Sequence, residues 1–597
     1  MRALLSQPLD SGMILKKKKR IRTELLKEKS NFMDLRVAIL GGSTTAEIKN
    51  ILEIFLLDSD IKPMFYESEY NKWYEDCVFE NKELDKFNPQ IVIFHTTFVN
   101  IMDLPDISDS RSTVMEKVDA LYEKFKSCWD KLREKYSCVI IQNNFELPNN
   151  RICGNMDFVN EYGYVNFVNL INNKFVEYAR ECRSFYINDI NYLSAYLGLK
   201  NWYDKNLYHM FKFAFSYEVI PHYCYNLATV IKASLGKSKK CIVLDLDNTL
   251  WGGVIGDDGI NNISLGHETA LGESYLDFQK YLLNLKNRGI ILAVCSKNEV
   301  DIAKTGFAHP DSILQLDDFT AFYANWEPKH INIINIAKDI NIGLDSLVFI
   351  DDNPVERQIV REHIPEVVVP EVIDGDPMSY INAIENGKYF EQLVISNDDL
   401  KRNQTYAENI RRNDLEKTFS SYEDFLKSLE MKAEIKSFES IYLDRITQLT
   451  NKTNQFNLTT RRYTRSEIDE IADSEMYLKI YGRLSDKFGD NGLVSVIIGR
   501  IEDETLHIDL WLMSCRVLKR DFEFAMFYEL ERLAKQRGLK YIRGYYFKTK
   551  KNSMVNNLFE TLGFKLLVQN GEDSEWIFNI DSNDKQRKII AIEVSKE

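Results

Sequence analysis

The sequence predicts a multidomain α/β protein with two doubly wound parallel sheets and an α+β region at its carboxyl end. Short apolar runs that suit buried strands, such as residues 35–40 and 91–95, alternate with helix-prone stretches, and the same alternation restarts near residue 241. Alternation of this kind is typical of parallel sheets covered by helices. The last part of the chain instead mixes strand runs with one long helical stretch at residues 521–537. The 597 residues suggest three to four domains at ~150 residues each.

The domain boundaries are placed where this pattern changes. The first segment is polar and helix-prone, and the run GKSKK at residues 236–240 has the composition of a linker. We therefore expect a helical leader at residues 1–34, an α/β domain at 35–235, a second α/β domain at 236–395, a charged helical connector at 396–430 and an α+β domain at 431–597.

Charge and cysteine content limit the possible partners. A formal net charge of −14 argues against binding nucleic acid or an anionic membrane, because both need a positive field. The basic run KKKKR at residues 16–20 is interpreted as a solvated helix face rather than a recognition site. Nine scattered cysteines without a CxxC pair suit a reducing compartment. No apolar stretch reaches the ~18 residues of a membrane helix, so we expect a cytoplasmic protein.

Two aspartates lie directly after the first strand of the second α/β domain. Asp245 and Asp247 belong to the run DLDNTL, and side chains two positions apart on an extended chain face the same way. Two carboxylates so close are unfavourable unless a cation lies between them, and Mg²⁺ favours a few carboxylates with substrate phosphate and water. We expect Asp245 to attack phosphorus and Asp247 to exchange a proton with the leaving group.

Further polar residues follow in the order that phosphoryl transfer needs. Ser296, at the end of the next strand, can hydrogen-bond a phosphoryl oxygen, and Lys329 in the run WEPK can neutralise its charge. Asp351 and Asp352 end a further strand and can complete a Mg²⁺ site with Asp245 and Asp247.

This constellation resembles the haloacid dehalogenase superfamily over roughly residues 240–370. The resemblance implies that Asp245 is the nucleophile, that Asp247 is the acid/base, and that Ser296 and Lys329 bind phosphate. It favours Asp352 over Asp351 as the metal carboxylate. Because the segment from Asp245 to Ser296 is too short for a large cap domain, we expect an open site.

Longer stretches resemble the FkbH-like family across nearly the whole chain. They are DLDNTLWGGVIGDDG at residues 245–259, LTNKTNQFNLTTRRYT at 449–464 and IQNNFELP at 141–148. The resemblance implies an enzyme that takes 1,3-bisphosphoglycerate, removes phosphate and leaves a glyceryl thioester on the phosphopantetheine thiol of an acyl carrier protein. It also implies that a central haloacid-dehalogenase, Rossmann-like domain is flanked by an SGNH-like α/β domain and a GNAT-like α+β domain.

The motifs expected of the two flanking folds are incomplete. Ser43 stands where SGNH hydrolases place their nucleophile, but the preceding Asp is missing, and Asp204 and His209 do not have the spacing of the terminal Asp-x-x-His. The favoured interpretation is a non-catalytic scaffold, with an active Ser43 as the alternative. In the GNAT-like domain, Lys519 and Asp521 replace glycines of the turn that binds the pyrophosphate of coenzyme A.

A cysteine way-station for the glyceryl group is a further expectation. Cys295 adjoins Ser296 and is the favoured candidate, and Cys515 is the other. Two alternatives to the loading enzyme stay open. One is a plain haloacid-dehalogenase-type phosphatase of a small phosphoester with flanking recognition domains, which the substituted glycines favour. The other is a scaffold with vestigial sites. The complete set of phosphoryl-transfer residues argues against this scaffold.

Overall fold

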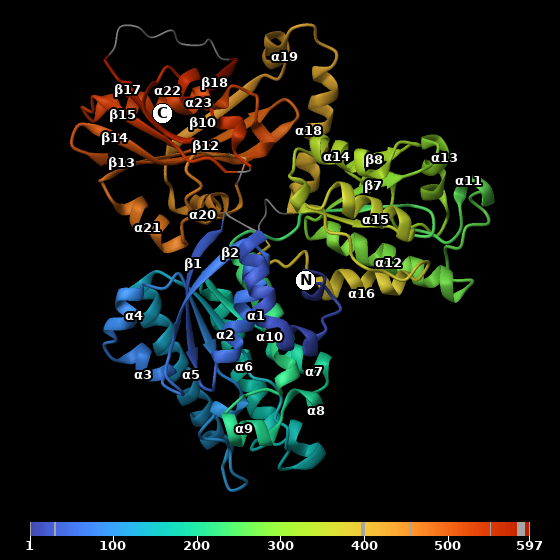
Figure 1. Ribbon diagram of the computed structural model, residues 1–597, viewed down its shortest axis with the longest axis vertical. Helices are drawn as coiled ribbons and strands as arrows, with labels where there is room; N and C mark the ends of the chain where they lie inside the picture. The colour runs from blue at the N-terminus through green and yellow to red at the C-terminus, as the bar shows by residue number, and fades with distance from the viewer. Residues whose placement is uncertain are drawn as a thin grey trace. The chain divides into compact units, whose positions relative to one another are not determined.

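The computed structural model describes residues 2–28, 32–395, 400–453, 455–549, 551–581 and 591–595 (Figure 1). The chain forms two compact units. One comprises Met1–Ser234 with Thr464–Ser466, and the other comprises Leu235–Tyr463 with Glu467–Glu597. The described residues contain one sheet in the first unit and two in the second. Within these ranges, no helix combines the length and apolar character that crossing a bilayer requires.

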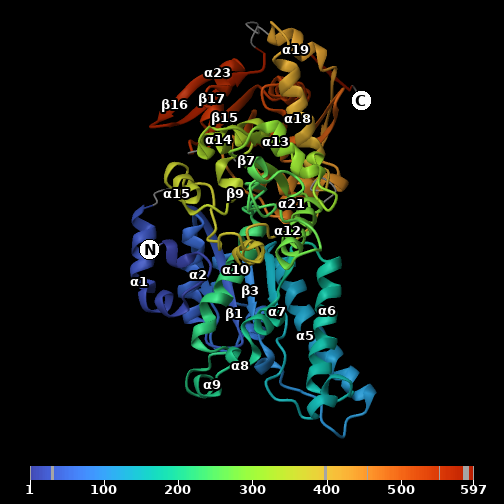
Figure 2. The same ribbon diagram turned by 90° about the vertical axis from the view of Figure 1, so that its right-hand side faces the viewer.

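The first unit is built on a five-stranded parallel sheet of order β2-β1-β3-β4-β5. Figure 2 shows α1 and α2 on one side of this sheet and α5 and α6 on the other. The strands are β1 (Met33–Gly41), β2 (Ile61–Glu67), β3 (Ile91–His95), β4 (Val139–Asn143) and β5 (Phe185–Asn188). The helices are α1 (Ser11–Glu28), α2 (Ala46–Asp58), α3 (Trp73–Val78), α4 (Lys82–Phe87), α5 (Arg111–Tyr136), α6 (Tyr164–Glu181), α7 (Ile190–Leu197), α8 (Leu199–Trp202), α9 (Lys205–Phe211) and α10 (Ile220–Ser234).

Polar side chains gather at the carboxyl end of this sheet. Ser43, two residues beyond β1, is 2% exposed, and its hydroxyl has no hydrogen-bond partner. His95 ends β3, and its Nδ1 lies 3.1 Å from the Tyr223 hydroxyl. Burial lowers the pKa of His95 to about 3, so its imidazole is neutral. Asp204 accepts hydrogen bonds from two backbone N–H groups at the start of α9, so it acts as a helix cap. The scaffold interpretation of this domain stays a prediction.

The first sheet of the second unit is a four-stranded parallel sheet of order β8-β7-β6-β9. Successive residues of each strand belong to two different hydrophobic clusters, one on each face, so the strands are apolar throughout. Its strands are β6 (Cys241–Leu244), β7 (Ile291–Ser296), β8 (Ala321–Ala324) and β9 (Leu347–Ile350). The helices are α11 (Ile255–Asp258), α12 (Ala270–Asn287), α13 (Val300–Thr305), α14 (Lys329–Ile340), α15 (Pro354–His363) and α16 (Pro377–Gly387), followed by α18 (Arg402–Glu416) and α19 (Tyr422–Ser428).

The second sheet of this unit is mostly antiparallel, with the order β16-β17-β15-β14-β13-β12-β10-β18. Its strands are β10 (Met431–Ser437), β12 (Tyr477–Asp486), β13 (Gly489–Glu502), β14 (Thr505–Met513), β15 (Tyr541–Tyr546), β16 (Lys565–Asn570), β17 (Asp573–Asn579) and β18 (Ile592–Val594). The helices are α20 (Leu443–Lys452), α21 (Arg465–Asp473), α22 (Phe522–Gln536) and α23 (Leu558–Thr561). This arrangement is the α+β architecture that the sequence predicts.

The neighbouring strands β14 and β15 diverge after three parallel residue pairs. The short strand β11 (Phe456–Asn457) pairs with the end of β14, at Met513 and Leu512. Beyond it, the backbone N–H of Leu458 donates to Trp511 O, and the N–H of Phe547 donates to Leu458 O. Part of residues 449–464, a stretch that resembles the FkbH-like family, therefore lies between the two strands. Its backbone hydrogen-bonds to β14 and to the residue that follows β15.

Candidate active site

The carboxyl ends of three parallel strands bring the predicted phosphoryl-transfer residues together. Leu244 of β6 pairs with Val294 of β7 on one side and with Ile350 of β9 on the other. Asp245 follows β6 directly and therefore lies at the level where β7 and β9 also end. The chain runs from β6 to β7 and β8, then returns to add β9 on the far side of β6. Such a reversal leaves a crevice at the carboxyl ends of the strands, where ligands bind.

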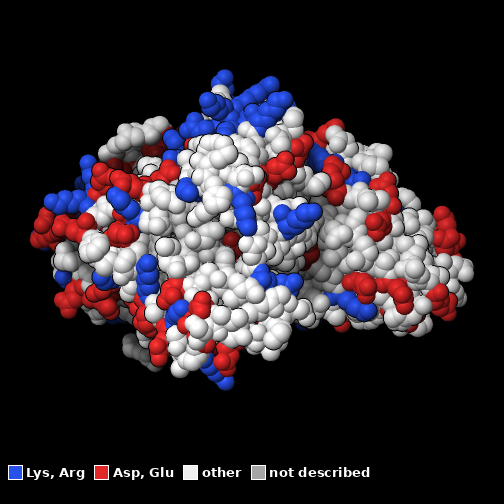
Figure 3. Space-filling model, turned by 90° about the horizontal axis from the view of Figure 1, so that it is seen from below, with Lys and Arg blue, Asp and Glu red and all other residues white. Residues whose placement is uncertain are grey.

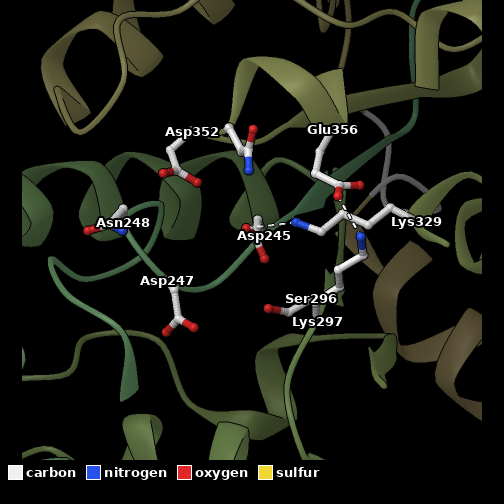
Figure 4. A pocket seen from close by; sticks show the side chains of 9 residues that line it. Asp245, Asp247, Asn248, Ser296, Lys297, Lys329, Asp352 and Glu356 are labelled. Carbon is white, nitrogen blue, oxygen red and sulfur yellow. Dashed lines mark hydrogen bonds and ion pairs between the residues drawn. The ribbon is translucent and has the colours of Figure 1, made fainter. Parts of the chain in front are cut away.

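A small cavity of about 200 Å³ lies at this position. Pockets for drug-sized ligands span roughly 300–1,000 Å³, so this cavity suits a smaller molecule. In Figure 4 the Lys329 ammonium points toward Asp245, whereas the Lys297 ammonium turns to Glu356. The lining residues are Asp245, Asp247, Asn248, Ser296, Lys297, Lys329, Asp352, Asn353 and Glu356. Of the residues predicted from the sequence, Cys295 and Asp351 do not line it.

Lys329 joins two buried carboxylates at the base of the cavity. Its Nζ lies 2.8 Å from Asp245 Oδ2 and 2.6 Å from Asp351 Oδ2, and its side chain is 3% exposed. Burial alone would lower the pKa of Lys329, but the charges of the two aspartates outweigh it and raise the pKa above its usual value. Lys329 therefore carries a permanent positive charge.

One ammonium does not balance the acidic groups at this site. Oxygen atoms of Asp245, Asp351 and Asp352 all lie within 4.8 Å of one another. Burial, followed by the charge of Asp245, raises the pKa of Asp351 to about 7 and that of Asp352 to about 6. The second oxygen of Asp245, Oδ1, is buried without a hydrogen-bond partner. An orphaned carboxylate oxygen beside excess negative charge fits a hard divalent cation such as Mg²⁺.

Asp247 is held apart from this acidic group. Its Oδ1 accepts hydrogen bonds from Trp251 Nε1 and the Ile255 backbone N–H, each at 3.0 Å, and its Oδ2 accepts one from Asn298 Nδ2 at 2.8 Å. The sequence predicts Asp247 as a fourth metal carboxylate, but the converging acidic group does not include it. The three donors instead fix its carboxylate at the cavity wall, as a proton-transferring group requires.

Asp351 and Asp352 have different surroundings. Asp351 is fully buried and accepts hydrogen bonds from Lys329 Nζ and from the backbone N–H of Asn353 at 2.9 Å. Asp352 lines the cavity and has no ion pair within the part of the chain that the structure describes. The geometry thus gives Asp352 the more accessible oxygens, and Asp351 anchors Lys329.

The structure also reveals site residues that the motif analysis did not single out. Asn298 connects Asp247 to the Ser296 hydroxyl, from which its Nδ2 lies 3.4 Å away. At the rim of the cavity, Lys297 Nζ and Glu356 Oε1 form an ion pair of 2.6 Å. The only sequence signal for Asn298 is its position two residues after Ser296.

The expectation that Cys295 reaches the substrate is wrong. Its side chain is fully buried in the hydrophobic cluster that includes Ile333 and Phe349. The thiol lies 3.7 Å from the backbone carbonyl of Lys329, under the start of α14. Burial raises the pKa of Cys295 well above its usual value. Neighbouring residues of a strand point to opposite faces, so the orientation that gives Ser296 access to the cavity turns Cys295 away from it.

The turn before α22 retains the shape of a glycine-rich turn. Lys519 and Asp521 adopt left-handed φ values of 63° and 60°, a conformation that favours glycine. The Arg520 guanidinium is used internally, because it binds Asp486 at 3.1 Å and the Asn409 amide oxygen at 2.9 Å. Cys515 is half-buried, with its Sγ 3.9 Å from the Tyr406 hydroxyl, and does not line the cavity.

The comparisons with known proteins match this description. Residues 36–232 match the family model for the FkbH N-terminal domain. A crystal structure of the N-terminal part of protein BF1531 from Bacteroides fragilis, containing a phosphatase domain complexed with Mg, has 31% identity and a TM-score of 0.59. It covers 64% of this chain and 99% of its own. No curated protein matches the chain.

Solved N-acetyltransferase structures match about a quarter of the chain. The ribosomal-protein-S18-alanine N-acetyltransferase of Escherichia coli has 12% identity and a TM-score of 0.20, and covers 26% of this chain and 99% of its own. The PaiA N-acetyltransferase of Thermoplasma acidophilum, solved in complex with coenzyme A, has 17% identity and a TM-score of 0.19. It covers 25% of this chain and 99% of its own.

Fold and site together define a protein of the haloacid-dehalogenase phosphatase type, which confirms the fold class expected from the sequence. The acidic residues converge at the strand ends of a parallel sheet, and the similar Bacteroides fragilis structure contains a phosphatase domain with Mg. The chain belongs to the FkbH-like family.

We expect Lys329→Met to destabilise the protein by about 3–5 kcal/mol, because it leaves two carboxylates buried without their cation. Chemical denaturation in the presence of a metal chelator measures this free energy of unfolding. Lys338→Met is the matched control, since Lys338 is exposed on the same helix α14. Equal stability of the two variants would contradict the importance of the buried ion pairs.

Cys295→Ala should retain phosphate release, because the thiol neither lines the cavity nor ionises at neutral pH. The loss of one buried sulfur should cost roughly 1 kcal/mol of stability. Initial rates and thermal unfolding check these expectations, and iodoacetamide should leave Cys295 unlabelled in the folded protein. Rapid labelling of this thiol, or a large loss of rate in a folded variant, would restore a catalytic role for it.

Proposed function

We propose that the chain is a Mg²⁺-dependent phosphoryl-transfer enzyme that dephosphorylates 1,3-bisphosphoglycerate and loads the glyceryl unit onto an acyl carrier protein as a thioester. The observation that carries the phosphoryl-transfer part is the arrangement around Asp245. One carboxylate oxygen is held by Lys329 and the other is free of hydrogen bonds beside Asp352. The substrate and the carrier rest on the resemblance to the FkbH-like family.

The side chains of the cavity divide the phosphoryl transfer into two displacements. Asp245 attacks phosphorus and forms an aspartyl phosphate, while the bond from phosphorus to the substrate oxygen breaks. Asp247 gives that oxygen a proton, then takes one from the water that hydrolyses the aspartyl phosphate. Lys329 and the Ser296 hydroxyl stabilise charge on the phosphoryl oxygens. A bound Mg²⁺, held by Asp245 and Asp352, would supply further neutralisation of that charge.

The loading step uses the other phosphate of the substrate. An acyl phosphate is a mixed anhydride, so a thiolate can attack its carbonyl carbon and expel phosphate without an additional energy source. The thiol belongs to the phosphopantetheine arm of the carrier, either directly or after transfer from an enzyme cysteine. With Cys295 buried, Cys515 is the remaining candidate for such an enzyme thiol. The small cavity is consistent with a three-carbon substrate.

A plain phosphatase of a small phosphoester is the second candidate function. The internal use of Arg520 favours it, because this guanidinium is not available to a coenzyme phosphate. The two candidates share the chemistry of Asp245 and differ only in whether a carrier receives the acyl group.

Asp245→Asn should reduce Mg²⁺-dependent phosphate release at least about a thousandfold, because it removes the attacking carboxylate while keeping its size. Chelation of Mg²⁺ in the wild type should have a comparable effect. The control is Asp257→Asn, which makes the same change at an exposed position on α11. Release by Asp245→Asn at the rate of this control would refute the assignment.

Intact-mass spectrometry tests the loading reaction. Wild type, 1,3-bisphosphoglycerate and each of several holo-carrier proteins are incubated together, and we expect one carrier to gain the mass of a glyceryl group. Asp245→Asn should yield a carrier that retains the phosphoglyceryl mass, if thioester formation precedes dephosphorylation.

The same experiment separates the alternatives. Phosphate release with no loaded carrier would support the plain phosphatase, and neither product would support a scaffold. Peptide mapping without a carrier then shows whether Cys515 holds an acyl adduct. A Cys515→Ala variant that loads its carrier normally would indicate direct transfer to the carrier thiol.

A further inference from the structure

The helix α1 exposes a row of basic side chains along one face. Lys16, Lys19, Arg20 and Lys27 are all exposed, and we call these four residues the basic stripe. Their spacing of three, one and seven residues keeps them on one side of a helix with 3.6 residues per turn. The stripe extends over about 17 Å at 1.5 Å per residue. Figure 3 shows a dense group of Lys and Arg side chains at its upper edge, the side that carries α1 in Figures 1 and 2.

The opposite face of α1 fixes the direction in which the stripe points. Ile14, Leu15, Ile21 and Leu25 are buried, and the helix packs against α2 and α10. Two other basic residues of α1 also hold it in place. Lys18 pairs with Glu47 and donates to the Tyr217 hydroxyl at 3.3 Å, and Arg22 Nε lies 2.7 Å from Glu53. The stripe is therefore presented by a docked, rigid helix.

Internal stability does not explain the stripe. In the described part of the chain, Lys16, Lys19 and Lys27 form no ion pair. Of the four stripe residues, only Arg20 has an acidic partner, Glu24, at 3.0 Å. Like charges three or four residues apart destabilise a helix by ~0.2–0.5 kcal/mol per pair. Such an arrangement has a small cost to folding, which a role in binding would explain.

We propose that the basic stripe docks an acidic carrier protein, the macromolecular partner of the proposed function, on which this inference rests. The whole chain has a net charge of −14 and therefore repels an acidic partner in general. A local positive face on such a surface directs the partner to one place and orientation. The helical leader then has a specific role in recognition, rather than being only a solvated face as the sequence pattern suggests.

A polyanion or a membrane is a less suitable occupant. Nucleic acid and anionic bilayers present negative charge over areas much larger than one helix face. A small acidic protein can contact the stripe alone. At physiological salt, charges interact over about 8 Å. A small acidic protein docked on the stripe therefore interacts mainly with the charges of the stripe.

Charge reversal on the full chain tests the docking. Fluorescence anisotropy measures binding of labelled holo-carrier proteins to wild type and to the triple variant Lys16→Glu, Lys19→Glu and Lys27→Glu. We expect about a tenfold rise in Kd for the carrier that binds, with most of the change in the association rate and less difference at high salt. Phosphate release from a small phosphoester should be unchanged, because α1 contains none of the cavity residues.

Two controls separate docking from folding and from total charge. The variant Lys62→Glu, Lys82→Glu and Lys86→Glu changes the net charge of the same unit equally, at exposed lysines outside α1, and should change Kd less than twofold. A Lys→Gln version of the stripe triple should show an intermediate Kd. Circular dichroism and thermal unfolding establish that each variant is folded.

The outcomes distinguish failure of docking from failure of the proposed function. Carrier loading by the stripe triple with wild-type kcat/KM would overturn the docking site while supporting the loading reaction. Stripe-dependent carrier binding without any loading would support the docking site and contradict the reaction. Any of three other results would overturn the inference. Both lysine triples could weaken carrier binding equally, no carrier could bind, or the stripe could bind only phosphatidylglycerol vesicles or a polyanion.

Discussion

The buried contact of Lys329 with Asp245 and Asp351 is the interaction on which the active site depends. Two carboxylates at the ends of adjacent strands repel each other, and burial makes the repulsion stronger because little water screens it. The ammonium between them allows both strands to end in acids at the same level of the sheet. It also fixes one oxygen of Asp245, so that only the other is available for chemistry.

The parallel sheet around this contact explains why so few residues suffice to build the site. Strands β6, β7 and β9 are apolar on both faces, so they can be buried completely, and polar groups are admitted only where each strand ends. Because all the strands run the same way, their polar ends meet at one edge. The same regularity excludes Cys295, since the residue before Ser296 must face the opposite layer of helices.

Charged residues serve different purposes in different parts of the chain. Arg520 lies beside the turn that resembles a coenzyme-binding loop, but its donors are satisfied by Asp486 and Asn409, so its charge stabilises the fold. Lys18 and Arg22 likewise anchor α1 through acidic partners on α2. The lysines of the basic stripe remain exposed to solvent. Basic residues of similar appearance in the sequence therefore divide into structural and surface groups according to what lies next to them.

The parallel α/β class and the main residues of the candidate site could be predicted from local sequence patterns alone. Apolar strand runs and their spacing reflect local geometry, so Asp245, Ser296 and Lys329 could be assigned to strand and helix ends without a structure. Tertiary structure decided the distribution of roles among neighbours. Asp351 anchors Lys329 whereas Asp352 lines the cavity, Asp247 is held by Trp251 and Asn298, and Cys295 is sealed under α14. These distinctions depend on side-chain directions and on contacts between residues far apart in the chain, which adjacent letters of a motif do not specify.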